Sequence, residues 1–355
     1  MLSNDLTDML QIDYPIIQAP MAGGITTPEL VSCVSEHGAL GSIGAGYMTP
    51  QSLRQHIKDV RKRTSNPFSV NVFVPNTFNV SVEEVEAAVN QLRPIRKALG
   101  VEGGNPSLPT PASMKRNFEE QINVILEEKV PICSFTFGVP AEEVVAELKK
   151  ENVKLMGTAT TVNEAMILES KGMDMIIIQG SEAGGHRGHF LAERDQSLIG
   201  LMSLIPQASD HVTVPVIAAG GIMDARGLVA ARYLGASAVQ MGTAFLTCAE
   251  SGAHPTYKEV ILNANEDDIV LTKAFSGKWA RGIKNTFIDD MKDYPSVPPF
   301  PVQNTLTSVI RKASADQHNP AYMSLWTGQN PRLATDHSAA TFIQHLVQEV
   351  KVITR

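Results

Sequence analysis

Few cysteines and no long hydrophobic run set the first limits on this chain. Its 355 residues include three cysteines, Cys33, Cys133 and Cys248, which are far apart and form no CxxC pair. This pattern argues against a disulfide framework and favours buried free thiols in a reducing compartment. The N-terminal residues lack the basic and apolar regions of a signal peptide, and no run reaches the roughly 18 apolar residues of a membrane helix. We therefore expect a cytoplasmic protein that enters no membrane.

Excess positive charge is also lacking. The formal net charge is −7, which argues against nucleic acid or an anionic membrane as a partner. This value says little about small anionic ligands, which respond to the local charge of a site. The hydrophobic fraction of 43% and the charged fraction of 19% are those of a globular protein without a disordered tract.

Several common site motifs do not occur. The chain contains no G-x-G-x-x-G, G-x-x-x-x-G-K-[ST], H-E-x-x-H or G-x-S-x-G, which argues against a Rossmann dehydrogenase, a P-loop NTPase, a zincin and an α/β-hydrolase. His186 and His189 have a spacing that a metal site could use. Because no acidic residue or cysteine stands near them at a persuasive ligand spacing, we expect no metal.

Strand-like and helix-like segments alternate along about 250 residues. The strand candidates are Pro15–Gln18, Ala39–Ile43, Ser69–Phe73, Ile132–Phe135, Lys154–Gly157, Met175–Gln179, Val214–Ala218 and Ala238–Met241. The helix candidates between them are Pro28–His37, with Thr27 as its N-cap, and Ser52–Arg63, Glu83–Leu99, Ala141–Glu151, Asn163–Lys171 and Ala225–Gly235.

This alternation predicts an α/β fold, a (β/α)8 TIM barrel with a small cap domain inserted after the last strand. Continuous apolar strands that are mostly followed by helices indicate a parallel sheet covered on both faces, and eight strands close a TIM barrel. An open doubly wound sheet is the alternative. We expect the barrel over residues 1–256, the cap over 257–330, and a return to the barrel wall over 331–355 through a helix at Ala339–Val352. Two Gly- and Pro-rich stretches, Gly100–Pro111 and Asp293–Pro301, interrupt the pattern.

The most informative stretch is Gln179–His189, QGSEAGGHRGH, which follows a buried strand candidate. Its glycines allow backbone N–H groups to approach a ligand closely and to form an anion site. His186 stands at the edge of this loop, where its titratable ring suits a base or a hydrogen-bond donor. A neutral histidine satisfied by loop carbonyls is the structural alternative.

Glycine clusters stand at the carboxyl ends of several predicted strands, where barrels place their active sites. They are Gly23-Gly24, Gly44 with Gly46, Gly184-Gly185, Gly220-Gly221 and Gly242. Ordinary turns explain each cluster singly, but the last two match the usual phosphate site of the fold. Thr243 and the backbone of Gln240, Met241 and Gly242 are then candidate phosphate contacts. The amides of Asn71 and Gln179 suit the edge of a flavin ring.

Four segments resemble the class I nitronate monooxygenases, formerly called 2-nitropropane dioxygenases. They are QAPMAGGITTPELV from Gln18, FSVNVFVP from Phe68, QGSEAGGHRG from Gln179, and AAGGIMDARG from Ala218 leading to VQMGTAFL from Val239. KAFSGKWARG from Lys273 and SLWTGQNPRLA from Ser324 are also similar to the family. The resemblance therefore covers nearly the whole chain.

The resemblance implies an FMN enzyme that oxidises alkyl nitronates with dioxygen to a carbonyl compound and nitrite, without a nicotinamide cofactor. Propionate 3-nitronate is the implied substrate and detoxification the implied role. His186 becomes the catalytic histidine. The implied FMN contacts are Met21, Ala22, Gly23, Gly24, Asn71, Gln179, Gly184, Gly220, Gly221, Gln240, Met241, Gly242 and Thr243.

Two other functions stay open at this point. An FMN-dependent enoyl-acyl carrier protein reductase that uses NAD(P)H has a similar AGGH loop, although Arg187 counts against it. A non-catalytic flavin- or phosphate-binding protein is the other. Two minor hypotheses concern substrate contacts: the basic residues Lys273, Lys278, Arg281 and Lys284 attract a carboxylate, and Tyr294 covers the pocket. The sequence leaves open the oligomeric state and the preferred nitronate length.

Overall fold

The main sheet has the strands that the sequence predicts. The computed structural model describes residues 1–101, 104, 106–292, 294 and 297–355, so the Gly- and Pro-rich stretches Gly100–Pro111 and Asp293–Pro301 lie partly outside the described residues. Within the described residues the sheet has eight parallel strands. They are β1 (Ile16–Gln18), β2 (Gly41–Gly44), β3 (Phe68–Phe73), β4 (Ile132–Thr136), β5 (Lys154–Ala159), β6 (Met175–Gln179), β8 (Val216–Ala219) and β9 (Ala238–Met241).

These strands curl into a nearly closed barrel. They pair in the order β1-β9-β8-β6-β5-β4-β3-β2, and Ile17 of β1 forms a further parallel bridge with Leu40, next to β2. Hydrogen bonds of 2.9 Å from Gln18 N to Leu40 O and from Leu40 N to Ile16 O join the two edges. An open sheet would keep these edges apart, so the predicted barrel of parallel strands is confirmed and the doubly wound alternative is excluded.

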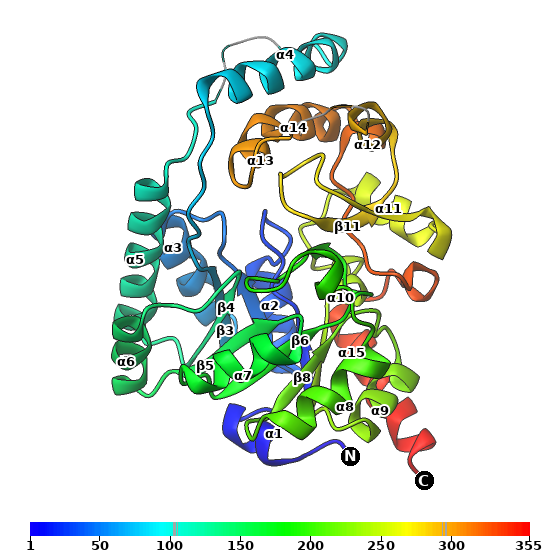
Figure 1. The fold of residues 1–355 in the computed structure, drawn as a ribbon. Helices are drawn as coiled ribbons and strands as arrows, with labels where there is room; N and C mark the ends of the chain where they lie inside the picture. The colour runs from blue at the N-terminus through cyan, green and yellow to red at the C-terminus, as the bar shows by residue number, and fades with distance from the viewer. Residues whose placement is uncertain (102–103, 105, 293, 295–296) are drawn as a thin grey trace.

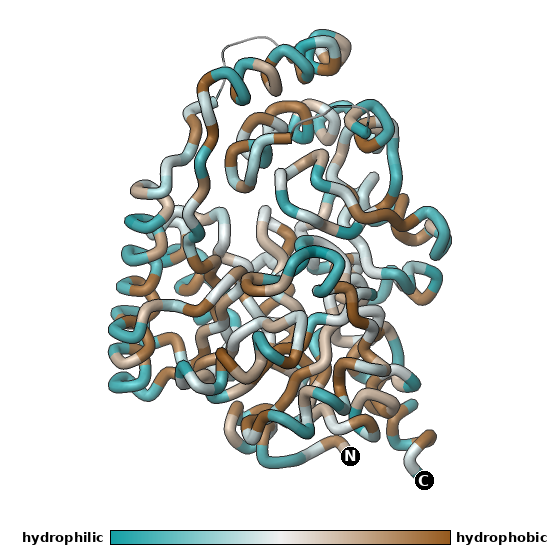
Figure 2. The backbone as a smooth tube through the Cα atoms, viewed as in Figure 1, coloured by the Kyte–Doolittle hydropathy of each residue, from teal (hydrophilic) through white to brown (hydrophobic). Residues whose placement is uncertain are grey.

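Helices surround the barrel, and α1 covers one of its ends (Figure 1). They are α1 (Asp5–Leu10), α2 (Pro28–Glu36), α3 (Pro50–Arg61), α5 (Pro111–Glu127), α6 (Glu142–Lys150), α7 (Val162–Ser170), α8 (Leu201–His211), α9 (Ala225–Tyr233) and α15 (Ala339–Ile353). Helix α2 begins as predicted, because the Thr27 hydroxyl accepts a 3.0 Å hydrogen bond from Leu30 N and Pro28 follows it. Sequence analysis did not predict α1, α5 and α8. Figure 2 shows apolar and polar residues alternating along these helices, as one-sided burial requires.

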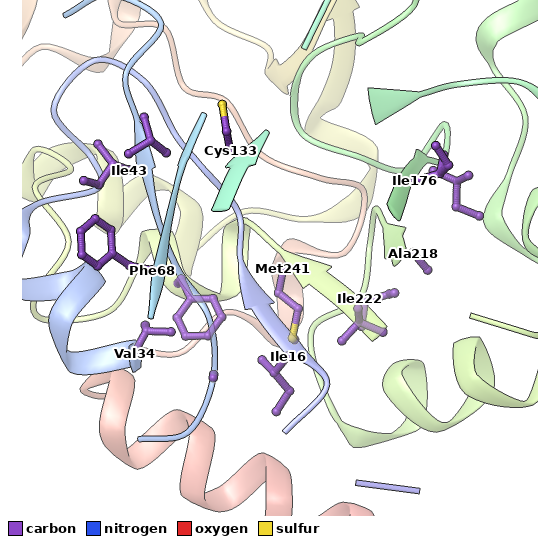
Figure 3. Packing of buried hydrophobic residues seen from close by; sticks show 14 of the residues in the cluster. Ile16, Val34, Ile43, Phe68, Cys133, Ile176, Ala218, Ile222 and Met241 are labelled. Carbon is purple, nitrogen blue, oxygen red and sulfur yellow. The ribbon is translucent and has the colours of Figure 1, made fainter. Parts of the chain in front are cut away.

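Alternate residues of the strands pack on opposite sides of the sheet. Ile16 and Ile176 face the surrounding helices in the main core, part of which Figure 3 shows. Their neighbours Ile17 and Ile177 belong to a separate interior cluster with Leu6 and other residues of α1. Helix α1 therefore packs on the barrel interior, and α15 packs outside against α9 and α2.

The remaining elements lie beyond the carboxyl ends of the strands. They are α4 (Val82–Ala98), β7 (Gly185–His186), α10 (Thr243–Leu246), α11 (Pro255–Leu262), β10 (Ile269–Thr272), β11 (Ala280–Ile283), α12 (Thr286–Met291), α13 (Val302–Leu306) and α14 (Ser308–Asp316). The 3-10 turns are η1 (Asp195–Ser197), η2 (Glu266–Asp268), η3 (Pro320–Tyr322) and η4 (Pro331–Leu333). Figure 1 shows α4, which follows β3, beside α13 and α14. Leu92 of α4 shares a buried cluster with Phe275, Phe287 and Leu306.

Two further features of the structure concern the cysteines and the possibility of a membrane-spanning helix. All three cysteines are free, with Cys133 and Cys248 buried and Cys33 half-buried. Among the residues that the structure describes, no helix is both long and apolar enough to span a membrane.

Candidate active site

A cavity of about 730 Å³ opens at the carboxyl ends of the barrel strands. This volume lies within the range of small-molecule and cofactor sites. Strand-end residues form its floor, including Asn71, Gln179 and Gln240, and residues of α14 and the segment after it form the opposite wall. The cavity therefore joins the barrel to the elements that follow β9.

Most of the predicted site residues line this cavity. They are Met21, Ala22, Gly23, Asn71, Gln179, Gly184, His186, Gly220, Gly221, Gln240, Gly242 and Thr243. Two others lie elsewhere. The Met241 side chain packs in the main core (Figure 3), because alternate residues of a strand point to opposite faces. Gly24 is exposed and is not among the lining residues, and its carbonyl approaches Gly252.

His186 is held by a small antiparallel sheet that the sequence did not reveal. Its two-residue strand, β7, pairs with β11 so that His186 stands opposite Ala280. His186 Nε2 lies 2.8 Å from Ser276 Oγ. The Ser276 hydroxyl also lies 3.0 Å from Lys278 O and has a single hydrogen, so it either donates to Lys278 O and accepts from the imidazole, or donates to the imidazole. This contact therefore fixes the orientation of the ring and is compatible with both neutral tautomers.

The surroundings of His186 keep its ring neutral. Burial lowers the pKa of His186 from 6.5 to about 3, and the positive charges of Lys278 and Arg311 act in the same direction. The imidazole is therefore uncharged at physiological pH. A neutral ring both donates and accepts one hydrogen bond, but it is a weak base.

Aromatic side chains surround His186, and two of them, Phe137 and Trp326, line the cavity. The ring centroids of Phe137, Phe300 and Trp326 lie 6.0, 5.8 and 5.6 Å from the imidazole centroid. Phe137 has a positive φ of 75°, a strained conformation that commonly marks functional sites. Sequence reasoning missed these rings, although Phe137 directly follows β4, where a barrel places site residues.

Arg187 fastens the loop that carries His186. Its side chain is fully buried and donates hydrogen bonds to Gly180 O at 2.6 Å, Gln179 O at 3.0 Å and Ser197 O at 2.6 Å. Burial lowers the pKa of Arg187 to about 10, so its guanidinium still carries its charge at neutral pH. Its role in the structure is to position the loop.

The two predicted amides have different surroundings. The Asn71 Nδ2 group donates to Ser134 Oγ at 2.9 Å and Thr136 Oγ1 at 3.1 Å, which leaves its carbonyl oxygen available to the cavity. The Gln179 amide instead joins the loop, because it donates to His186 O at 3.0 Å and accepts from Gly188 N at 2.8 Å. The Gln179 side chain therefore holds the loop that carries His186 in place.

Glycines and the segment after η3 form a close-packed cradle. Gly220 and Gly221 have φ angles of 138° and 63°, which residues with side chains rarely adopt. A Cβ on Gly184 would overlap the backbone of Thr327 and Gly328. Gly328 N in turn donates to Thr243 Oγ1 at 3.0 Å. Thr327 and Gly328 are additional cavity residues, and the family-like segment from Ser324 was their only signal in the sequence.

The four basic residues predicted to attract a substrate each have a different partner. Lys284 pairs with Asp289 on the surface, Lys273 is exposed beside the Trp279 ring, and Arg281 donates to Ser181 O at 2.9 Å. Lys278 lies 4.9 Å from the Phe137 ring and donates to the carbonyl of His189.

Tyr294 and His189 also lie away from the cavity wall. Tyr294 packs against the cluster that α4 and α12 share. The His189 ring is partly buried, and burial lowers its pKa to about 4. Over the described ranges of the chain, no three His, Cys, Asp or Glu side chains gather in a way that would hold a metal ion. The fold and its strand-end cavity place the chain among the TIM-like barrel enzymes.

Comparisons with known proteins give the family. The nitronate monooxygenase family model matches residues 3–349. The probable nitronate monooxygenase of Staphylococcus haemolyticus (strain JCSC1435) is 49% identical over 354 residues, covering 99% of this chain and 98% of the relative. The chain therefore belongs to the nitronate monooxygenase family of flavin-dependent oxidoreductases, which confirms the resemblance seen in its motifs.

Solved structures agree with this assignment. The nitroalkane oxidase from Streptomyces ansochromogenes is 37% identical with a TM-score of 0.90, and the match covers 99% of each chain. FabK from Thermotoga maritima is 30% identical with a TM-score of 0.76, covering 100% of this chain and 98% of that one.

Proposed function

We propose that the enzyme binds FMN in this cavity and oxidises propionate 3-nitronate with dioxygen to a carbonyl compound and nitrite, as a detoxifying reaction. The observation that carries the proposal is the buried neutral imidazole of His186, which meets the strand-end cavity beside a cradle built from glycine backbone. Such a site suits an anionic cofactor and a substrate that needs no strong base.

The chain's own residues fit FMN. Gly184, Gly220 and Gly221 present backbone alone to the cavity, because a Cβ on any of them would meet protein atoms at 3.0 Å or less, and Thr243 adds a hydroxyl. Exposed backbone N–H groups and a hydroxyl suit a phosphate. The free carbonyl oxygen of Asn71 suits an N–H group at the edge of a flavin ring. Bound FMN would supply the electron-transfer chemistry that amino-acid side chains lack.

His186 and the aromatic side chains prepare the substrate for this chemistry. A nitronate is already a carbanion equivalent, so the weakly basic His186 is sufficient. The nitronate only accepts hydrogen bonds, so His186 positions it as the tautomer that carries its proton on Nδ1, with Ser276 donating to Nε2. Phe137, Phe300 and Trp326 exclude water from the same space. A neutral nitroalkane would first need a stronger base, so we propose nitronates as the substrates.

The elements beyond the strand ends supply the substrate side. We propose that residues 257–330 act as a cap, on a barrel formed by residues 1–256 and completed by 331–355. Because Leu92 shares a core with Phe287 and Leu306, α4 packs with this cap although it precedes it by more than 150 residues in the chain.

An oxygen-electrode assay tests the proposed function. Purified enzyme should carry FMN and consume oxygen with propionate 3-nitronate at the same rate with and without NADH, and it should release nitrite. Absence of oxygen uptake would contradict the proposal. Oxidation of NADH that depends on an enoyl thioester would support the reductase alternative, and bound FMN without any turnover would support a binding protein.

A further inference from the structure

The cavity is positively charged although the protein is acidic. The chain has a formal net charge of −7. Among the described residues that line the cavity, Arg311 and Lys312 are cationic and none is Asp or Glu; Lys312 pairs with Asp316 outside this lining, which leaves Arg311 as the unpaired charge. Because a low-dielectric cleft strengthens the field of its charges, this lining favours anionic ligands over neutral ones.

Arg311 has an unusual set of partners for a largely enclosed guanidinium. From α14 its Nη2 group donates to Asn304 O at 2.7 Å and to Asn304 Oδ1 at 3.0 Å. These two bonds hold one side of the planar group. Its Nε is buried without a hydrogen-bond partner, and in the described part of the chain no carboxylate pairs with Arg311. Nε is enclosed by protein, whereas Nη1 has no hydrogen-bond partner among the described residues and is available to a ligand.

Arg311 also acts on the space in which the reaction takes place. Its charge contributes to the lowered pKa of His186, and it interacts electrostatically with Tyr47, another residue of the cavity wall. Thr305 and Ser308 add hydroxyl groups beside it on the lining. Arg311 and His186, the candidate catalytic residue, therefore line the same cavity.

We propose that Arg311 binds the carboxylate of the substrate, which makes the enzyme selective for nitronates that carry a second anionic group. A guanidinium presents its N–H donors in a planar fork that matches a carboxylate. The inference rests on the proposed function, because it concerns the substrate of the same site. Arg311 takes the substrate-binding role that the sequence predicted for a set of basic residues. Of that set, Lys284 forms an ion pair with Asp289, and Arg281 donates a hydrogen bond to Ser181 O.

The test compares two nitronates on one set of variants. With Arg311→Gln, kcat/KM for propionate 3-nitronate should fall ~10- to 100-fold, mainly through KM, because a charge-assisted hydrogen bond is lost. For propyl 1-nitronate, in which a methyl group replaces the carboxylate, the change should stay within about twofold. Arg311→Lys should give an intermediate loss. The matched control Lys284→Met removes one exposed charge and should behave as the wild type.

Three results would overturn the inference: no loss with Arg311→Gln, an equal loss with both nitronates, or a loss of FMN content, which would assign Arg311 to the cofactor. A binding measurement separates this inference from the proposed function. Propionate should quench the fluorescence of Trp326, which lines the cavity, with saturation in the wild type and at least tenfold weaker binding in Arg311→Gln. Equal binding would contradict the role of Arg311 even if neither nitronate were turned over.

Discussion

At the residue scale, burial decides how His186 functions. An exposed histidine changes its charge near pH 6.5, but the enclosed ring of His186 keeps its neutral form because its pKa is lowered to about 3. Its Nε2 lies 2.8 Å from Ser276 Oγ, so the ring has a fixed orientation. The sequence left the choice between base and donor open, and this environment disfavours a strong base.

His186→Asn should lower kcat with propionate 3-nitronate by roughly 10²-fold, in line with the loss of one positioned polar group at a reacting centre. The FMN content should stay near that of the wild type, since the cradle at Gly184 and Gly221 does not depend on the imidazole. Stopped-flow anaerobic reduction together with absorbance of the bound cofactor would measure both. Unchanged turnover would show that His186 is a structural residue.

Acid should destabilise the protein between pH 7 and pH 5 through its buried histidines. The pKa values of His186 and His189 are lowered to about 3 and about 4, so in this range the unfolded chain binds protons that the folded chain does not. The free energy of unfolding therefore falls as the pH falls below 6.5. Urea titrations at pH 7, 6 and 5 would show this slope, and His186→Asn should reduce it. A slope of the opposite sign would contradict these pKa shifts.

At the element scale, the loop after β6 is held from two sides. Arg187 ties it to the barrel through three backbone carbonyls. Strand β11 pairs with β7 on the other side and places Ala280 opposite His186. A loop held only by turns would let the imidazole move, whereas these two attachments fix it relative to the cavity.

Gly184→Ala should weaken FMN binding by about tenfold or more, because overpacking a tight contact costs on the order of 1–3 kcal/mol. The new methyl group would press on the backbone of Thr327 and Gly328 and widen the cradle. Fluorescence titration of apoprotein with FMN would measure the dissociation constant. Gly104→Ala is the matched control, because no atom of the described residues lies within 4 Å of a Cβ added at Gly104. Equal dissociation constants for the two variants would show that the close contact is unimportant.

At the scale of the whole molecule, the cavity connects two separately packed cores. The barrel core holds Ile16 and Phe68 on one side, and the second core holds Phe275 and Phe287 on the other. Residues from both sides line the space between them, such as Gln240 from β9 and Arg311 from α14. A ligand in this position contacts both parts and should strengthen their association.

FMN should therefore raise the melting temperature of the apoprotein. A ligand that binds only the folded state at 100 times its dissociation constant adds about 2.7 kcal/mol to the free energy of unfolding. Differential scanning fluorimetry over a series of FMN concentrations would show a progressive rise in Tm. A Tm independent of FMN would contradict a cofactor site in this cavity. Riboflavin, which lacks the phosphate, should give a smaller rise if the glycine cradle holds that group.

Much of the barrel could be predicted because its signals are local. Each strand is a short apolar run, and Thr27 followed by Pro28 is sufficient to begin α2. Glycines at strand ends then located the cavity, since parallel strands bring their carboxyl ends together. Helix α5 was missed although it begins with the same signal, Thr110 followed by Pro111, because this signal ends the Gly- and Pro-rich stretch Gly100–Pro111, which indicates a loop.

The sequence by itself determined the order of strands, the glycine-rich ends and the loop that carries His186, because these depend on neighbouring residues. Only the tertiary structure decided which distant side chains complete the site. Arg311 and Trp326 reach the cavity through the packing of elements far along the chain, and α4 joins them through a shared core. The neutral state of His186 was decided in the same way, since desolvation depends on everything that surrounds the ring.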